Sequence, residues 1–158
     1  MQTWFECKVK YLKMDQSGNE KKCTDTYLLD AVSFTDAETR IFMQMQELSS
    51  GEFQVKNINR SNISEVINKV DGEWYYKAKI SLISIDEESG KEKKMTQYIL
   101  VMADDIDQAH SNLSEGLSNM LIPYAVTGMN LSTIAEVFHY DIEKGVDEMT
   151  SKDNVEFP

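Results

Sequence analysis

The chain has 158 residues, 41% of them hydrophobic and 27% charged, which fits one globular domain and excludes collagen-like and intrinsically disordered chains. Sixteen basic residues oppose 27 acidic ones, so the net charge is −11. Two histidines and two cysteines leave little material for nucleophilic or metal chemistry, which favours a binding protein over an enzyme.

The first residues show no targeting segment. Trp4 lies in an alternating strand pattern without the basic and apolar regions of a signal peptide, and no run approaches the roughly 20 apolar residues that cross a bilayer. Cys7 and Cys23 are a single pair, which is typical of reduced thiols rather than of a small secreted scaffold. We therefore expect a cytoplasmic protein that does not associate with membranes.

The sequence repeats itself with an offset of 71 or 72 residues. Residues 4–9 align with 75–80, and 17–24 align with 89–96. Residues 59–66 align in the same way with 130–137. We infer a single duplicated domain. Its bounds are 1–140, with repeat one at 4–68 and repeat two at 75–139.

Each repeat is predicted to begin with a hairpin. Apolar side chains alternate with polar ones in residues 5–11 and again in 76–82, which is the pattern of a half-buried strand. A turn at Ser17-Gly18 or Ser89-Gly90 connects each of these strands to a second one. The residues expected to point inward from the second strands are Tyr27, Leu29 and Ala31, matched by Tyr98, Leu100 and Met102.

A helix is predicted next. Thr35 and Glu38 have the spacing of a capping box, and Asp104, Asp105 and Asp107 mark the start of the second helix. The buried face of the first helix is expected to carry Ala37, Ile41, Met45 and Leu48. A third strand, at 52–60 and 124–130, and a short helical turn close each repeat.

The order of these elements defines the expected fold class. It is α+β, with two tandem ββαβ repeats related by a pseudo-twofold axis, an antiparallel sheet, and the helices packed on one face. One continuous sheet and two separate sheets both agree with this order.

The charge is unevenly distributed. Residues 104–158 carry −9 of the net −11, so the first 103 residues are close to neutral. In that part the outward positions of the first strands combine an aromatic residue with lysines, an arrangement that binds single-stranded nucleic acid by stacking and phosphate contacts. The candidate binding residues are Trp4, Lys8, Lys10, Lys21, Lys22, Tyr75, Lys77, Lys79, Lys93 and Lys94. Alternatively, because Glu6, Glu20 and Glu92 lie among them, the lysines serve only solubility and edge protection.

Residues 141–158 read as an acidic, flexible tail. In composition this segment resembles the acidic, aromatic-tipped tails of bacterial and phage single-stranded DNA-binding proteins. The resemblance implies that the tail recruits partners, through Asp153, Glu156 and Phe157. The alternative is an ordinary frayed terminus.

No catalytic residue, metal ligand or cofactor site is predicted. The sequence contains no phosphate-binding glycine motif and no paired cysteine or histidine motif. His110 and His139 have no duplicate in the other repeat, so we interpret both as surface residues.

Several segments are similar to an uncharacterised family of about 160 residues from Bacteroidetes and the phages of gut Bacteroidetes, crAss-like phages included, a length close to the 158 residues here. They are residues 4–9, 51–55 with Ile58 and Arg60, and 83–94 with 96–98. The resemblance implies a mobile-element setting and no particular activity.

Two functions fit this setting. The first is single-stranded nucleic-acid binding in phage or mobile-element replication, with replication proteins as partners. The second is a protein-interaction or ligand-sequestering module that inhibits a host defence factor through the acidic residues of 104–140. The repeat would also suit a homodimer.

Overall fold

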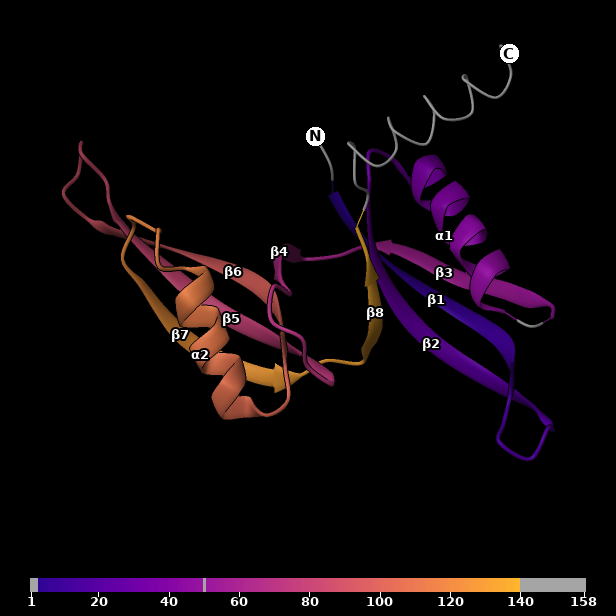
Figure 1. Cartoon of the computed structure of the whole chain (residues 1–158). Coiled ribbons are helices and arrows are strands. Elements are labelled where there is room, and N and C mark those ends of the chain that lie inside the picture. Colours follow the sequence, from indigo (N-terminus) through magenta and orange to yellow (C-terminus); the bar gives the residue numbers. More distant parts are fainter. Residues whose placement is uncertain (1–2, 50, 140–158) are drawn as a thin grey trace, which may run out of the picture. The chain divides into compact units, whose positions relative to one another are not determined.

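The computed structural model describes residues 3–49 and 51–139. Within these residues the chain forms two helices and eight strands, and the strands make two four-stranded sheets (Figure 1). The predicted α+β class is therefore confirmed. The repeat agreed with one continuous sheet or with two separate sheets, and the strands form two sheets.

Both repeats form the same elements in the same order. Each has a hairpin of two long strands, then a helix, then two shorter strands. Repeat one contains β1 (Thr3–Met14), β2 (Glu20–Ala31), α1 (Phe34–Leu48), β3 (Phe53–Arg60) and β4 (Ile63–Ile67). Repeat two contains β5 (Trp74–Ile85), β6 (Glu92–Ala103), α2 (Ile106–Gly116), β7 (Tyr124–Leu131) and β8 (Ile134–Phe138).

The end of each repeat differs from its prediction. The sequence predicts a short helical turn after the third strand, whereas the structure has the strands β4 and β8 there. Both segments are rich in β-branched residues, and Ile63 and Ile134 are buried at their starts. Pairing with a neighbouring strand satisfies the backbone groups of such a segment more fully than one helical turn would, which explains the difference.

These last strands are exchanged between the repeats. The sheet orders are β3-β1-β2-β8 and β4-β6-β5-β7, so repeat two contributes β8 to the first sheet and repeat one contributes β4 to the second. The compact units of the chain are consequently unit 1, with the described residues up to 59 and from 136, and unit 2, with residues 60–135. No hairpin joins β4 to β6, so their pairing need not be antiparallel. It is parallel, and the second sheet is mixed where the sequence predicts an antiparallel one.

In unit 1 the core lies between the sheet and α1. Phe5, Cys7 and Val9 of β1 are buried, as their alternation predicts, and they form one cluster with Ile41 and Met45 of α1. Each buried side chain of this kind contributes about 1.5–3 kcal/mol, so this cluster is a main source of stability. Leu48 was expected on the same helix face, but it is the last residue of α1 and is 47% exposed.

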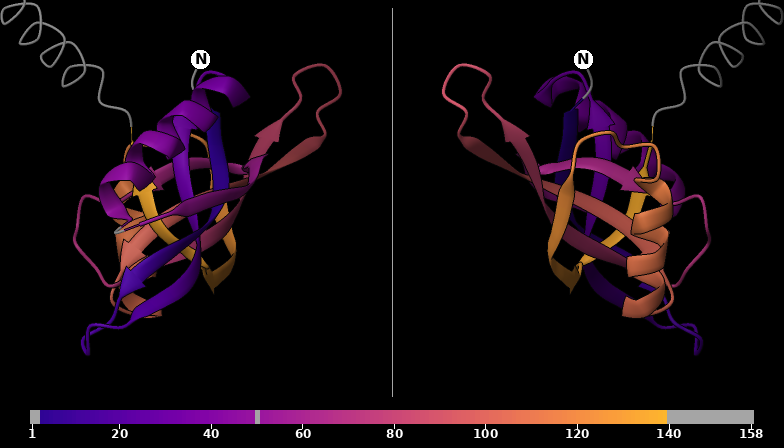
Figure 2. Two further views of the ribbon diagram at one scale, coloured as in Figure 1. Left: turned by 90° about the vertical axis from the view of Figure 1, so that its right-hand side faces the viewer. Right: turned by 90° about the vertical axis from the view of Figure 1, so that its left-hand side faces the viewer.

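In unit 2 the core lies between the sheet and α2. Ala78 and Ile80 of β5 and Leu113 of α2 are fully buried together with Ile99 and Val101 of β6. The inward residues of β6 are therefore one position away from the predicted Tyr98, Leu100 and Met102. The prediction matched the inward residues of β2 with the residues 71 positions later in β6. The hairpin registers show that the equivalent residue is 72 positions later along the whole strand. The β5–β6 hairpin extends beyond the other strands of its sheet (Figure 2).

Both hairpin turns depend on a glycine and an aspartate. Gly18 and Gly90 have φ angles of 83° and 70°, which glycine adopts without strain. The Asp15 carboxylate accepts a hydrogen bond from the Asn19 amide, and this bond lowers the pKa of Asp15. Asp86 holds the turn of the second hairpin with its own carboxylate.

The first helix begins earlier than its predicted capping box. The Ser33 hydroxyl accepts a hydrogen bond from the Asp36 amide at 3.1 Å, and the Asp36 carboxylate accepts one from the Val32 amide at 3.0 Å. Ser33 and Asp36 thus cap the start of α1 in place of Thr35 and Glu38, with the Asp36 carboxylate on the amide of the residue before the cap. Ser33 and Asp36 have the same spacing as Thr35 and Glu38, and the helix begins at the earlier pair.

Candidate functional site

Three lysines of the predicted site lie on the face of the first sheet opposite α1. In the β1–β2 register, Lys8 pairs with Thr26 and Lys10 pairs with Thr24, while Lys22 lies two residues further along the same face. Lys8 and Lys22 are exposed and Lys10 is half-buried. We call Lys8, Lys10 and Lys22 the lysine face of unit 1. Lysines with neighbouring hydroxyl groups are the side chains that contact phosphate in nucleic-acid complexes.

The second sheet repeats this arrangement. Lys77, Lys79 and Lys94 lie on the face opposite α2, and we call them the lysine face of unit 2. Lys77 Nζ lies 4.8 Å from the centroid of the Tyr98 ring, a cation–π contact that orients the ammonium group. Lys79 is exposed and pairs with Tyr98 in the register. The duplication therefore places cations on the corresponding face of each sheet.

The two aromatic residues of the predicted site are packed rather than open. Tyr75 lies on the predicted face but is 7% exposed, so its ring offers no stacking surface. Trp4 is half-buried and stacks on the His139 ring, with centroids 5.6 Å apart. Trp74, which was not predicted, is 50% exposed. The alternation of inward and outward residues along β5 places Trp74 on the α2 side of the sheet. The sequence pattern therefore did not mark it as an outward-facing aromatic.

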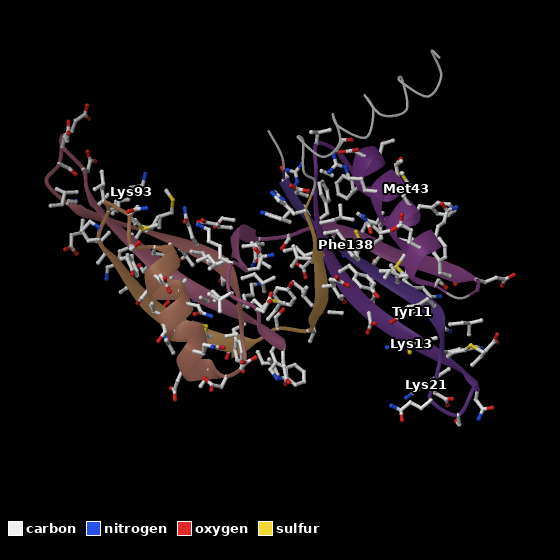
Figure 3. All side chains as sticks on the ribbon, viewed as in Figure 1. Tyr11, Lys13, Lys21, Met43, Lys93 and Phe138 are labelled. Carbon is white, nitrogen blue, oxygen red and sulfur yellow. The ribbon has the colours of Figure 1, made fainter. Side chains whose placement is uncertain are left out.

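The predicted hairpin lysines are divided between two faces. Lys21 pairs with Lys13 on the α1 side of the first hairpin, near its turn (Figure 3). Lys93 pairs with Ser84 on the α2 side of the second hairpin. These two lysines therefore point away from the lysine faces, because adjacent strand residues project to opposite sides.

A buried ion pair that the sequence did not indicate lies at the end of β2. The side chain of Asp30 is 3% exposed, and its Oδ1 lies 3.5 Å from Arg40 Nη1 of α1. His139 Nδ1, directly after β8, lies 2.8 Å from Asp30 Oδ2. Trp4 pairs with Asp30 in the register and stacks on His139. We call Asp30, Arg40, His139 and Trp4 the Asp30 cluster.

The second repeat shows what this cluster adds to the fold. Met102 takes the place of Asp30, and Asn112 takes the place of Arg40. Asn112 Nδ2 donates a hydrogen bond to the Met102 carbonyl at 2.9 Å, just as Arg40 Nη1 donates to the Asp30 carbonyl at 3.0 Å. The bond from helix to strand therefore belongs to both repeats, whereas the buried carboxylate and its Arg40 partner occur in repeat one alone among the described residues. His139, the other partner of this carboxylate, follows β8 of repeat two. His139, interpreted from sequence as a plain surface residue, is 63% exposed but holds this carboxylate.

The two thiols differ in their environment. Cys7 is fully buried, and burial raises its pKa to about 12, whereas Cys23 is half-buried. Burial also raises the pKa of Tyr11, whose hydroxyl donates a 2.6 Å hydrogen bond to Asp25. Both cysteines are free, as predicted for reduced thiols.

We expect one thiol per native chain to react with a thiol reagent at neutral pH, and two after unfolding. The thiolate is the reactive form, and a buried thiol with a raised pKa forms almost none of it. Titration with a chromogenic disulfide measures both counts. Cys23→Ser should remove the native reaction, and rapid reaction of both thiols in the native protein would contradict the burial of Cys7.

Part of the acidic stretch 104–140 has a structural role. The Asp104 carboxylate accepts a hydrogen bond from the Glu73 amide at 3.0 Å. The Asp105 carboxylate caps α2 by accepting from the Gln108 amide at 2.8 Å. Asp107 lies in the first turn of α2, where a negative charge is favourable. These three residues account for much of the acidity of this stretch as the start of a helix.

An apolar groove of about 500 Å³ lies between α1 and β3 in unit 1, and we call it the α1–β3 groove. Phe34 and Phe42 line it from α1 and are 52% and 51% exposed. Phe53 and Val55 line it from β3, and the rings of Phe42 and Phe53 are 5.1 Å apart. This groove is not evident from the sequence, because aromatics at helical spacing cannot be distinguished by pattern alone from the margin of a buried face.

The remaining predicted residues lie outside the described part of the chain. They are Asp153, Glu156 and Phe157 of the predicted tail at 141–158. Within residues 3–49 and 51–139, no helix has the length and apolar character to cross a membrane. In the same residues no group of three or more His, Cys, Asp and Glu side chains is placed to hold a metal ion.

The fold and these surfaces define a class: a duplicated α+β protein in which each repeat completes the sheet of the other and the sheet faces opposite α1 and α2 carry lysines. A family model described as a domain of unknown function (DUF4494) matches residues 3–140, and the chain belongs to this family. No curated protein matches the chain.

Proposed function

We propose that the protein is a non-enzymatic binding protein that holds single-stranded nucleic acid on its lysine faces. The observation that carries this proposal is the placement of Lys8, Lys10 and Lys22 on one face, repeated in unit 2 by Lys77, Lys79 and Lys94. Cations clustered on one face bind the phosphate backbone even when the total charge of the protein is negative.

The packing of the aromatics shapes this function. Because Trp4 and Tyr75 are packed, phosphate contacts should supply most of the affinity and base stacking little of it. Binding should then tolerate any sequence and weaken steeply with salt. Replication of a phage or another mobile element is the setting that the sequence resemblance supports, with the acidic residues of 141–158 recruiting partners.

The alternative of a protein-interaction module relied on the acidic stretch 104–140. Asp104 and Asp105 of that stretch are engaged in the start of α2. On the lysine faces Lys8, Lys22, Lys79 and Lys94 are exposed, and these faces are therefore the better-supported site.

Reversing two charges on the lysine face should weaken binding selectively. We expect Lys8→Glu with Lys10→Glu to lower the affinity for oligo-dT at least about tenfold, and to reduce the slope of log K against log salt by roughly 0.7 for each phosphate that the protein no longer neutralises. Fluorescence anisotropy at low and moderate salt, with a matched duplex for comparison, measures both.

The same hairpin provides the matched control. Lys13→Glu with Lys21→Glu changes the net charge equally but on the α1 side, so it should weaken binding much less. An equal loss of affinity in both double variants would indicate a general charge effect and no site. The proposal would be overturned if the wild-type chain bound neither oligonucleotide at either salt concentration.

A further inference from the structure

The α1–β3 groove lies beside an unpaired sheet edge. β3 is the outermost strand of the order β3-β1-β2-β8, so its outer row of backbone groups has no strand partner in that sheet. The groove is lined by residues 53–58 of this strand and by Phe34 and Phe42. A segment added to β3 would therefore gain main-chain hydrogen bonds and place alternate side chains in the groove.

The second repeat shows that the helix does not require an exposed aromatic residue at the position of Phe42. Phe42 and Met43, 51% and 60% exposed, correspond to Ser114 and Glu115, which are exposed on α2. The polar residues maintain the same helix in unit 2. The exposed ring of Phe42 is thus a feature of repeat one that the helix itself does not need. It points to a partner for the groove.

The charge and the pattern of one segment of this chain fit the groove. β3 carries Lys56 and Arg60 and no acidic residue. Residues 153–158, Asp-Asn-Val-Glu-Phe-Pro, place Val155 and Phe157 at alternate positions with Glu156 between them. In an extended strand Val155 and Phe157 share one face and Glu156 takes the other.

We propose that residues 153–158 add to β3 as a fifth strand of the first sheet, with Val155 and Phe157 in the α1–β3 groove. Val55 of β3 is half-buried against the core and Lys56 is exposed. An added strand in register therefore brings Glu156 to the side of Lys56. Pro158, which has no amide hydrogen, is tolerated on an outermost strand.

The chain is long enough for this contact within one molecule. β8 and β3 are the two outer strands of the same sheet, three strand spacings or about 14 Å apart. The 13 residues between His139 and Asp153 can extend to about 43 Å. Neither strain nor a second copy is needed, and the added strand would protect the edge from pairing with other chains.

Hydrogen–deuterium exchange of the full chain tests the proposal. We expect the β3 amides to exchange at least about tenfold faster in Phe157→Ser than in wild type, because losing one buried aromatic shifts such a docking equilibrium by that factor or more. Phe42→Ser, which introduces the residue of repeat two, should have the same effect from the other side of the contact. β7, the corresponding outer strand of unit 2, is the internal control and should not change.

Two further arms identify the occupant. Met43→Glu changes an exposed residue outside the groove lining and should leave β3 exchange as in wild type. Protection that is independent of protein concentration supports docking within one chain, whereas protection that rises with concentration assigns the groove to a second copy and overturns the proposal. Equal β3 exchange in wild type and Phe157→Ser also overturns it. The lysine faces take no part in this contact, so its failure leaves the nucleic-acid proposal unaffected.

Discussion

Arg40→Asn is expected to lower the free energy of unfolding by about 3 kcal/mol, because it removes the guanidinium group from a buried carboxylate. Asp30 is 3% exposed, and Arg40 Nη1 lies 3.5 Å from its Oδ1. His139 remains as a partner of Asp30, but its side chain is 63% exposed and its share of the interaction is weakened by solvent. Urea unfolding followed by circular dichroism measures the change.

The second substitution of the pair should reverse this loss. Asp30→Met in the same chain removes the buried charge, and the double variant reproduces the Met102 and Asn112 arrangement of repeat two. Replacing a whole buried ion pair by a packed apolar side chain is often neutral or stabilising. We therefore expect the double variant to unfold within about 1 kcal/mol of wild type, as mutational coupling of contacting residues allows.

The opposite pattern would contradict this account of the cluster. If Arg40→Asn were neutral, the ion pair would contribute nothing to stability. If the double variant were as unstable as Arg40→Asn alone, the loss would come from the helix and not from the carboxylate.

Phe138→Ala is expected to destabilise the protein by about 3 kcal/mol, through reduced burial and the cavity left behind. Phe138 is the last residue of β8 (Figure 3). Its ring stacks on Tyr27 of β2 with centroids 5.3 Å apart. It packs against the core cluster of unit 1, although it belongs to repeat two. The substitution should therefore increase amide exchange in β2, far away in the sequence.

The other repeat again supplies the control. Ile67 of β4 takes the equivalent place against the core of unit 2. Phe138→Ile should thus cost about 1 kcal/mol, within the range of volume-conserving changes, when measured by the same urea titration. A neutral Phe138→Ala would show that β8 is not needed to close the first sheet.

The repeat and the period-two pattern predicted much of the fold correctly. The alternation from Phe5 to Tyr11 places these residues in the core, and Gly18 and Gly90 adopt the expected turn conformation. Both features depend on residues close in sequence. The inward set on β6 was wrong by one position, because a single-residue shift in a strand exchanges its two faces.

The candidate site was predicted in part. Alternation alone placed Lys8 and Lys10 on one face, and the register confirms this placement. Alternation could not reveal that Tyr75 is buried. Burial on the sheet face opposite the helix depends on which other parts of the chain cover that face.

The sequence by itself determined the class of fold, the duplication, the two hairpins and helices, and the faces of the lysine-bearing first strands. These features follow from side-chain periodicity and from turn chemistry within a few residues. The tertiary structure alone decided the exchange of β4 and β8, the burial of Asp30 against His139, and the groove between α1 and β3. Each of these joins segments far apart in the chain, and the free energy that selects such contacts comes from packing and from the pairing of buried charge, which no local pattern encodes.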